Sequence, residues 1–389
     1  MTFEQELAAD LAAREAAGLR RVRRRLDTPQ RAQVDVDGRH YIAFCSNDYL
    51  GLAADPRLAA AAREALMLYG VGAGASHLIL GHSRAHQELE DALAAFAGMP
   101  AALLFSTGYM ANLGVISALV GRGDAVFADR LNHASLNDAV LLSRAAFKRY
   151  PHNDLAALER LLATTPARRR LVAVDAVFSM DGDIAPVREL LALCERHDAL
   201  LYLDDAHGFG VLGEQGRGTL SHFNLSHSSI ISPRIVYMAT LGKAAGVSGA
   251  FVAGSAVIIE TLLQQARTYI YTTAAPPLLA HTLLASLEII AAGDERRAQL
   301  RARIAQLQEG LAGLPWPLLP SETPIQPLIV GDNRQVLALS AKLAEQGLLV
   351  PAIRPPTVPQ GSARLRISLS ADHSKADVAR LVTALREAA

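Results

Sequence analysis

A lysine in a short glycine-containing segment is well suited to covalent chemistry. Lys243 follows the apolar run 235–238, within the segment 239–246, whose sequence is ATLGKAAG. A lysine amine that is partly desolvated, or close to other cations, has a lowered pKa and can form a Schiff base. Thr240 could bind a phosphate at the same strand end. A lysine after a strand is more often solvent-facing, so this segment alone does not assign the chemistry.

A carboxylate and a histidine follow the preceding apolar run, residues 200–203. Asp204 and His207 belong to the segment DDAHGFG, which begins at that point. A carboxylate at the end of a buried strand is unfavourable unless a cation pairs with it, and a protonated pyridine nitrogen is such a cation. His207 could then hydrogen-bond the oxygen of the same ring. The alternative is a capping aspartate beside a core histidine.

A third polar segment, residues 106–112 with the sequence STGYMAN, follows the run 101–105 and opens a predicted helix. Free amide groups and the helix dipole make such a turn a phosphate site, although an ordinary N-cap has the same composition. Phosphate turn, then Asp-x-x-His, then Thr-x-x-Lys is the order that a cofactor with a phosphate, a ring nitrogen and an aldehyde requires. The three segments together favour pyridoxal 5'-phosphate (PLP).

The elements between these segments predict an α/β fold. Strands are predicted at 101–105, 125–128, 171–176, 200–203, 235–238 and 250–253, with helices such as 83–96 and 187–197 between them. This alternation predicts a mostly parallel sheet covered by helices on both faces, with its site at the carboxyl ends of the strands.

The two ends of the chain have different patterns. Residues 4–25 predict an amphipathic helix with an arginine-rich end, in an N-terminal arm of residues 1–40. A large domain of residues 41–285 precedes a smaller α+β domain of residues 286–389. A helical region at 278–314, strands at 325–330, 348–353 and 364–370, and a last helix ending at Arg386 are predicted there.

Composition excludes several classes of function. Lys plus Arg (38) equals Asp plus Glu (38), so no net field favours nucleic acid or an anionic membrane surface. Cys45 and Cys194 are far apart, which argues against a disulfide framework or a structural zinc site, and no metal is expected. The apolar stretch 276–293 contains His281 and Glu288 and is too short to span a membrane. Without an evident export signal, we expect a cytoplasmic protein.

The sequence resembles the α-oxoamine synthase family of fold-type-I PLP enzymes over nearly its whole length. The motifs that carry the resemblance are SNDYLGL at 46–52, DRLNHAS at 129–135, VFSMDGD at 177–183, DDAHG at 204–208 and GEQGRG at 213–218. The resemblance implies a large PLP-binding domain with a smaller C-terminal domain, and a site at the interface of a homodimer.

The resemblance also implies roles for single residues. Lys243 resembles the Schiff-base lysine that also removes the α-proton, Asp204 the partner of the ring nitrogen, and His207 the ligand of the ring oxygen. His133 resembles the imidazole that stacks on the ring and orients the substrate. The implied cofactor-binding set is Gly108, Tyr109, His133, Ser179, Asp204, His207, Thr240 and Lys243.

The implied substrates rest on the segment IRPPTVP at 353–359. It is similar to the branch of the family, in biotin biosynthesis, that condenses L-alanine with a pimeloyl thioester and releases CO2. Arg354 would bind the amino-acid carboxylate, Thr357 and Arg21 would lie near the acyl group, and Asn47 would lie near the reacting groups, as would His133. Whether acyl carrier protein or coenzyme A carries the acyl group stays open. The alternative is the branch that joins glycine to acetyl-CoA to give 2-amino-3-oxobutyrate.

Two segments depart from the family pattern. Ala75 stands where the family usually has glycine, and His77 stands where arginine is frequent. Residues 223–233 are longer than expected and predict an extended surface loop.

Overall fold

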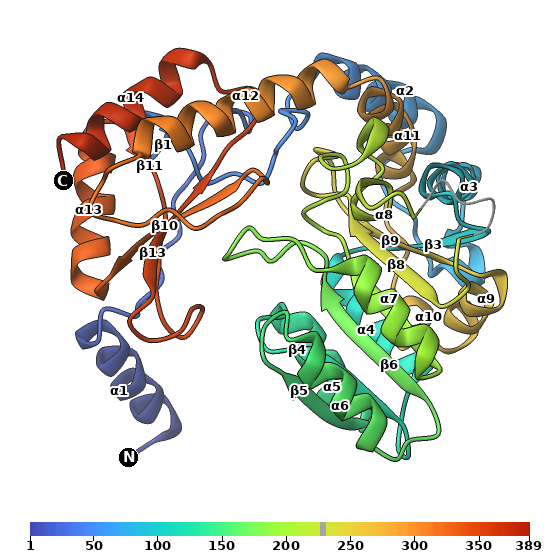
Figure 1. The fold of residues 1–389 in the computed structure, drawn as a ribbon. Coiled ribbons are helices and arrows are strands. Elements are labelled where there is room, and N and C mark those ends of the chain that lie inside the picture. The colour runs from blue at the N-terminus through green and yellow to red at the C-terminus, as the bar shows by residue number, and fades with distance from the viewer. Residues whose placement is uncertain (226–230) are drawn as a thin grey trace.

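A seven-stranded sheet forms the centre of the computed structural model, which describes residues 1–225 and 231–389 (Figure 1). Its strand order is β3-β9-β8-β7-β6-β4-β5. The strands are β3 (Ala101–Phe105), β4 (Ala125–Asp129), β5 (Ala146–Tyr150), β6 (Arg170–Asp175), β7 (Ala199–Asp204), β8 (Ile235–Thr240) and β9 (Ala250–Gly254). Strands β4 to β8 pair in parallel and β9 is antiparallel to both of its neighbours, so the predicted mostly parallel sheet is confirmed.

Helices cover both faces because alternate side chains of the inner strands point in opposite directions. On one face Val126, Leu171 and Tyr202 pack against residues of α4 (Gly108–Leu119) and α5 (Ala134–Ser143). On the other face Phe127 and Val172 pack in a cluster with residues of α3 (Arg84–Ala97), α6 (Leu155–Thr164), α7 (Val187–Arg196) and α11 (Pro277–Ala291). The large helices therefore form two layers around a buried sheet.

Strand β5 is the strand of this sheet that the sequence analysis did not predict. Its sequence, AFKRY, places Lys148 and Arg149 in the middle, and its pairing with β4 leaves it at the edge of the sheet. Charged residues are common on edge strands because one side of the strand faces solvent. The apolar runs that predicted the inner strands are absent there for that reason.

The C-terminal part contains two small sheets. Strands β10 (Ile325–Gly331), β13 (Ala363–Ser368) and β12 (Ala352–Ile353) form one, and β1 (Gln33–Val36), β2 (Arg39–Ala43) and β11 (Leu348–Leu349) form the other. The predicted strand 348–353 is therefore wrong as one element, because Pro351 has no amide proton and separates β11 from β12. The second sheet contains residues from both sides of position 40. The domain boundaries at 40 and 285 remain predictions.

Helices complete this part. The predicted helical region 278–314 is two helices, α11 and α12 (Asp294–Leu311), with Gly293 between them. The other helices are α13 (Asn333–Glu345) and α14 (Lys375–Arg386) here, and α2 (Pro56–Tyr69), η1 (His77–Gly81), η2 (Glu214–Gly216), α8 (Thr219–His222), α9 (Ala256–Gln265) and α10 (Arg267–Ile270) elsewhere.

The N-terminal helix is shorter than predicted. Helix α1 covers Phe3–Ala16, not 4–25, and Gly18 follows it with a φ of 65°. A left-handed glycine just after a helix ends it, so the arginine-rich stretch lies outside the helix. No residue of α1 is buried.

In the described part of the chain, no helix is both long and apolar enough to cross a membrane. Part of the predicted loop extension at 223–233, namely residues 226–230, lies outside the described residues.

Candidate active site

The residues predicted to bind the cofactor line one cavity of about 200 Å³ at the carboxyl ends of the parallel strands. Asp204 ends β7, Thr240 ends β8, and Gly108 begins α4 directly after β3. Parallel strands all present these ends at the same edge of the sheet, which explains why segments far apart in sequence meet there. The lining residues are Gly108, Tyr109, Asn112, His133, Ser135, Asp175, Ser179, Asp204, Ala206, His207, Met238, Thr240 and Lys243.

Lys243 extends its amine into this cavity. Burial of the amine lowers the pKa of Lys243 to about 8, although the nearby Asp204 and Asp175 carboxylates act in the opposite direction. Lys243 Nζ lies 2.8 Å from His207 Nε2. Near neutral pH a useful fraction of this amine is therefore unprotonated and able to act as a nucleophile or a base.

A chain of hydrogen bonds continues from Lys243 to a buried arginine. His207 Nδ1 lies 2.7 Å from the Tyr49 hydroxyl, which donates to Asn47 Oδ1 at 3.1 Å. Asn47 Oδ1 also accepts from both terminal nitrogens of Arg366 at 3.3 Å. Burial, together with the charge of Lys243, holds the pKa of His207 well below its usual range. Neutral His207 can thus accept a hydrogen bond from Lys243 on Nε2 while Nδ1–H donates to Tyr49.

Two buried carboxylates, Asp204 and Asp175, also line the cavity. Asp204 Oδ2 accepts from Asn112 Nδ2 at 2.8 Å, and Asn112 Oδ1 accepts from the Tyr202 hydroxyl at 2.6 Å. Asp175 ends the neighbouring strand β6 beside Asp204. Burial and then the charge of Asp204 raise the pKa of Asp175 well above its usual range. The polar partners of Asp204 therefore orient its carboxylate towards a cation in the cavity.

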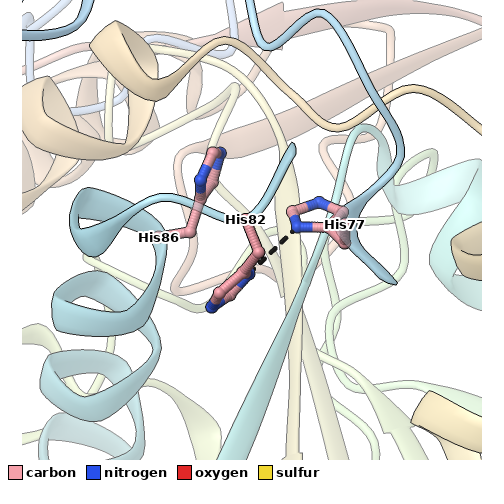
Figure 2. A group of neighbouring side chains, drawn as sticks. All are labelled: His77, His82 and His86. Atoms are coloured by element: carbon pink, nitrogen blue, oxygen red, sulfur yellow. Dashed lines mark hydrogen bonds between the residues drawn. The ribbon is translucent and has the colours of Figure 1, made fainter. Parts of the chain in front are cut away.

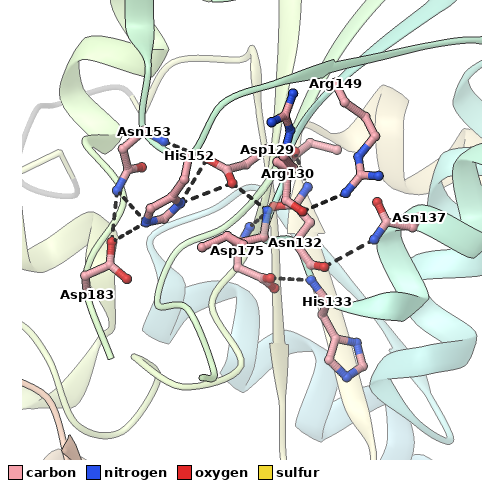
Figure 3. A network of polar contacts seen from close by, with 12 residues as sticks. Asp129, Arg130, Asn132, His133, Asn137, Arg149, His152, Asn153, Asp175 and Asp183 are labelled. Carbon is pink, nitrogen blue, oxygen red and sulfur yellow. Dashed lines mark hydrogen bonds and ion pairs between the residues drawn. The ribbon is translucent and has the colours of Figure 1, made fainter. Parts of the chain in front are cut away.

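The loop between β4 and α5 positions His133. The His133 amide donates to Asp175 Oδ2 at 2.6 Å, and Asn132 Nδ2 donates to the Ala173 carbonyl at 2.7 Å. His133 Nδ1 lies 2.7 Å from Ser135 Oγ. Figure 3 shows the His133 ring projecting away from this polar network, while its backbone stays anchored to the end of β6.

His152 anchors the other side of that loop (Figure 3). Its Nδ1 lies 3.1 Å from Asp129 Oδ1 and its Nε2 lies 2.8 Å from Asp183 Oδ2. Burial opposes the charged form, but hydrogen bonds to both carboxylates raise the pKa of His152 to about 10. The imidazolium therefore ties the end of β4 to the segment that contains Ser179.

The turn at the start of α4 presents backbone amides to the cavity. The Thr107 side chain accepts from the Met110 amide at 3.1 Å, while the first amides of a helix have no acceptor within it. The Gly108 Cα faces Thr240, since a Cβ added at Gly108 would lie 3.8 Å from Thr240 Cβ. Tyr109 is about half exposed and its hydroxyl donates to Asp138. This end of the cavity has the donors that a phosphate requires.

The residues predicted to bind substrate lie in two separate places. Arg21, Arg354 and Thr357 line a second cavity of about 520 Å³, between the segment after α1 and residues 352–357. There the Arg354 guanidinium donates to the Gly18 carbonyl. Asn47 instead belongs to the hydrogen-bond chain that ends at Lys243.

Sequence reasoning missed several residues of the site. Tyr49 lies in the motif SNDYLGL, Asn112 in the turn STGYMAN and Arg366 in the predicted strand 364–370, but none of the three was predicted as a site residue. Arg366 is one of two buried arginines on strand β13, the other being Arg364, and a buried arginine in a strand is itself a signal of a buried anion or acceptor.

The cavity fits PLP on the chemistry of its own side chains. A primary amine of lowered pKa suits an aldehyde, a buried carboxylate suits a protonated ring nitrogen, and helix amides beside a threonine hydroxyl suit a phosphate.

Comparisons with known proteins agree with this fit. Residues 39–385 match the family model described as aminotransferase class I and II. The chain is 64% identical, over 99% of both chains, to 8-amino-7-oxononanoate synthase of Nitrosomonas europaea. It is 31% identical to the solved 8-amino-7-oxononanoate synthase of Francisella tularensis, covering 89% of this chain and 97% of that one with a TM-score of 0.77. A solved serine palmitoyltransferase of S. paucimobilis with bound PLP–myriocin is 30% identical, covers 98% of this chain and 96% of that one, and has a TM-score of 0.91.

The sequence motifs, the fold and these similarities agree on one assignment. The chain belongs to the aminotransferase class I and II family and, within it, to the PLP-dependent acyltransferases named 8-amino-7-oxononanoate synthase.

Proposed function

We propose that this chain condenses L-alanine with a pimeloyl thioester to give 8-amino-7-oxononanoate, CO2 and the free carrier, in biotin biosynthesis. The observation that carries the proposal is the convergence of the Lys243 amine, His207 and Asp204 in one cavity. The names of relatives that are about 60% identical over nearly the whole chain support the choice of substrates.

PLP, when bound, supplies an aldehyde that condenses with amines and a protonated ring that accepts the electron pair released at the α-carbon. Lys243 would hold the aldehyde, Asp204 the ring nitrogen, and His207 the ring oxygen. Gly108, Tyr109 and Thr240 would bind the phosphate end with Ser179 nearby, and His133 would stack on the ring. These assignments use side chains that line the same cavity.

Lys243 would also move the proton at the α-carbon of alanine. An amine with a pKa of about 8 exchanges protons readily near neutral pH. The contact between Lys243 Nζ and His207 Nε2 places this amine beside the residue that would hold the ring oxygen. His133, which the Asp175 contact fixes, would orient the amino acid on the other side.

Arg366 with Asn47 is a candidate for the amino-acid carboxylate in addition to Arg354. Arg366 lies close enough to Lys243 for its charge to lower the lysine pKa, and its guanidinium joins the chain that leads to that amine. Arg354 lines the second cavity, together with Arg21 and Thr357. We infer that Arg366 binds the carboxylate of alanine and that the second cavity binds the acyl substrate.

A second copy of the chain is a further part of the proposal. Large apolar side chains are exposed in two nearby segments of the sequence, one at and just after the end of α2 and one on η1, namely Leu66, Met67, Leu68, Val71, Leu78, Ile79 and Leu80. Apolar side chains gathered in this way are typical of subunit interfaces. We propose that they form the interface of a homodimer.

The free cysteines Cys45 and Cys194 suit a reducing cytoplasm.

Product analysis by mass spectrometry tests the proposed reaction. The PLP-loaded protein is incubated with L-alanine and either pimeloyl-CoA or pimeloyl acyl carrier protein, and separately with glycine and acetyl-CoA. We expect 8-amino-7-oxononanoate and CO2 from at least one pimeloyl thioester and no product from the glycine pair. Reaction of the glycine pair alone would overturn the substrate assignment and leave the family assignment intact.

A further inference from the structure

Three histidines gather where η1 leads into α3, outside the Lys243 cavity. His77 begins η1, His82 follows it, and His86 lies in the first turn of α3. One ring nitrogen from each histidine lies within 4.8 Å of the other two. Figure 2 shows the three side chains grouped at this junction, with His77 and His82 linked through their ring nitrogens.

The spacing of two of these rings already suits a metal. His77 Nδ1 lies 3.1 Å from His82 Nδ1. Two nitrogens bound to one tetrahedral zinc ion, each about 2.0–2.1 Å from it, lie roughly 3.4 Å apart. If the two rings moved slightly apart, a metal ion could therefore replace the proton that they share.

His86 is oriented as metal-binding histidines usually are. Its Nε2 lies 2.8 Å from the Ala275 carbonyl, which can only accept a hydrogen bond, so Nε2 carries the ring proton and Nδ1 is an acceptor. His86 Nδ1 accepts from the Ser83 amide at 3.0 Å and lies 2.9 Å from Ser83 Oγ, and a bound metal would replace these contacts. The carbonyl thus fixes both the tautomer and the direction of the ring.

The electrostatic surroundings also favour a bound cation. Glu90 Oε2 lies 3.9 Å from His82 Nε2. A cation at the histidines would favour the ionised form of this carboxylate.

We propose that His77, His82 and His86 bind one divalent transition-metal ion of the class that prefers imidazole, such as Zn²⁺, Co²⁺ or Ni²⁺. Mg²⁺ and Ca²⁺ prefer oxygen ligands and do not fit three imidazoles. The ion would join η1 to the start of α3 and fix the exposed apolar residues of η1. No metal was expected from the spacing of the two cysteines, and the H-x4-H-x3-H spacing of residues 77–86 is the feature of the sequence that indicates this site.

Co²⁺ titration of the PLP-loaded, tag-free protein tests the proposal. The protein is first treated with EDTA and kept free of amino acids, which with PLP would chelate the metal themselves. We expect one Co²⁺ per chain, with the visible absorption bands of nitrogen-coordinated cobalt, and displacement of Co²⁺ by Zn²⁺ in calorimetry. No binding, or bands typical of oxygen ligands alone, would overturn the site.

Matched variants locate the ion. His82→Asn should weaken Co²⁺ binding at least about tenfold, whereas His40→Asn, which removes an exposed histidine outside the cluster, should leave it unchanged. Equal binding by His82→Asn and the unsubstituted protein would place the ion elsewhere and overturn the proposal. If His82→Asn does not fold, as judged by circular dichroism, His77→Gln decides by the same criterion. None of these measurements depends on the proposed reaction.

Discussion

At the scale of single residues, the properties of Lys243 come from its surroundings. Lysine in water has a pKa near 10.4, and burial in this cavity lowers it to about 8. The hydrogen bond to His207 then directs the amine. The chemistry expected of this residue can be tested by its covalent bond to PLP and by its titration.

Replacement of Lys243 by alanine should abolish covalent attachment of PLP. After borohydride reduction, the peptide that contains Lys243 should gain the mass of one reduced cofactor in the unsubstituted protein and none in Lys243→Ala. Activity should fall by about 10²–10⁴-fold or more, because the base at the α-carbon is lost. Lys342→Ala, which changes an exposed lysine, is the control and should keep both properties. Labelling of another lysine in the unsubstituted protein would contradict the assignment.

The pH dependence of PLP capture by the cofactor-free protein should report the lowered pKa. The unprotonated amine reacts, and the folded pKa lies below the ordinary value, so the capture rate should rise about tenfold per pH unit below about pH 8 and level off above it. Stopped-flow absorbance measures this rate. A rate that keeps rising to pH 10 would show that Lys243 titrates as an ordinary lysine.

The two arginines near substrate should differ in which Michaelis constant they control. Arg366→Lys should raise the KM for L-alanine at least about tenfold, because a bidentate guanidinium contact is lost. Arg354→Lys should mainly raise the KM for the pimeloyl thioester, because Arg354 lines the second cavity. Steady-state kinetics with each substrate varied in turn separates these effects. The reverse pattern would show that Arg354, and not Arg366, binds the carboxylate of alanine.

At the scale of elements, His152 joins parts of the fold that carry site residues. It contacts Asp129 at the end of β4, and Asp183 in the segment that follows Ser179. The loop that begins at Asp129 contains His133, so a structural ion pair and the position of a site residue are coupled (Figure 3). Removal of the imidazolium should affect folding stability in a pH-dependent way.

The contribution of His152 to folding should be largest at low pH. Its pKa rises from the ordinary 6.5 to about 10 on folding, so the contribution is fully present below about pH 6.5 and is lost as the pH rises towards 10. The unfolding free energy of His152→Gln should therefore lie furthest below that of the unsubstituted protein at pH 6 and approach it at pH 9–10. Urea unfolding at several pH values measures the difference, and His40→Gln serves as the control. A constant difference across this range would contradict the charged state of His152.

At the scale of the whole molecule, the exposed apolar stretch on α2 and η1 should decide the oligomeric state. Ile79 and Leu80 are 80% and 86% exposed in the single chain. Ile79→Glu with Leu80→Glu should convert the expected dimer to a monomer, because buried carboxylates without partners are unfavourable at an interface. Sedimentation velocity measures the state, and Leu337→Glu on α13 should stay dimeric. A monomeric unsubstituted protein would overturn the proposed dimer.

The architecture and the chemical content of the site can be read from the amino-acid sequence. Inner strands such as β4 and β6 were predicted within a residue or two, because strands buried on both faces must be continuously apolar. Polar residues at or shortly after the ends of strands, such as Asp204 and Lys243, can be recognised in the sequence. Parallel strands bring such residues to the same edge of the sheet. Edge strand β5 and the split between β11 and β12 were missed, because solvent exposure and a proline hide the apolar pattern.

Which residues meet in the site depends on the folded arrangement of the chain. The chain from Arg366 through Asn47, Tyr49 and His207 to Lys243 joins segments that are far apart in sequence, so no local pattern could predict it. The same holds for the separation of Arg354 from Lys243 into different cavities. A pKa depends on burial and on neighbours in space, and for that reason the lowered pKa of Lys243 and the raised pKa of His152 required the folded arrangement.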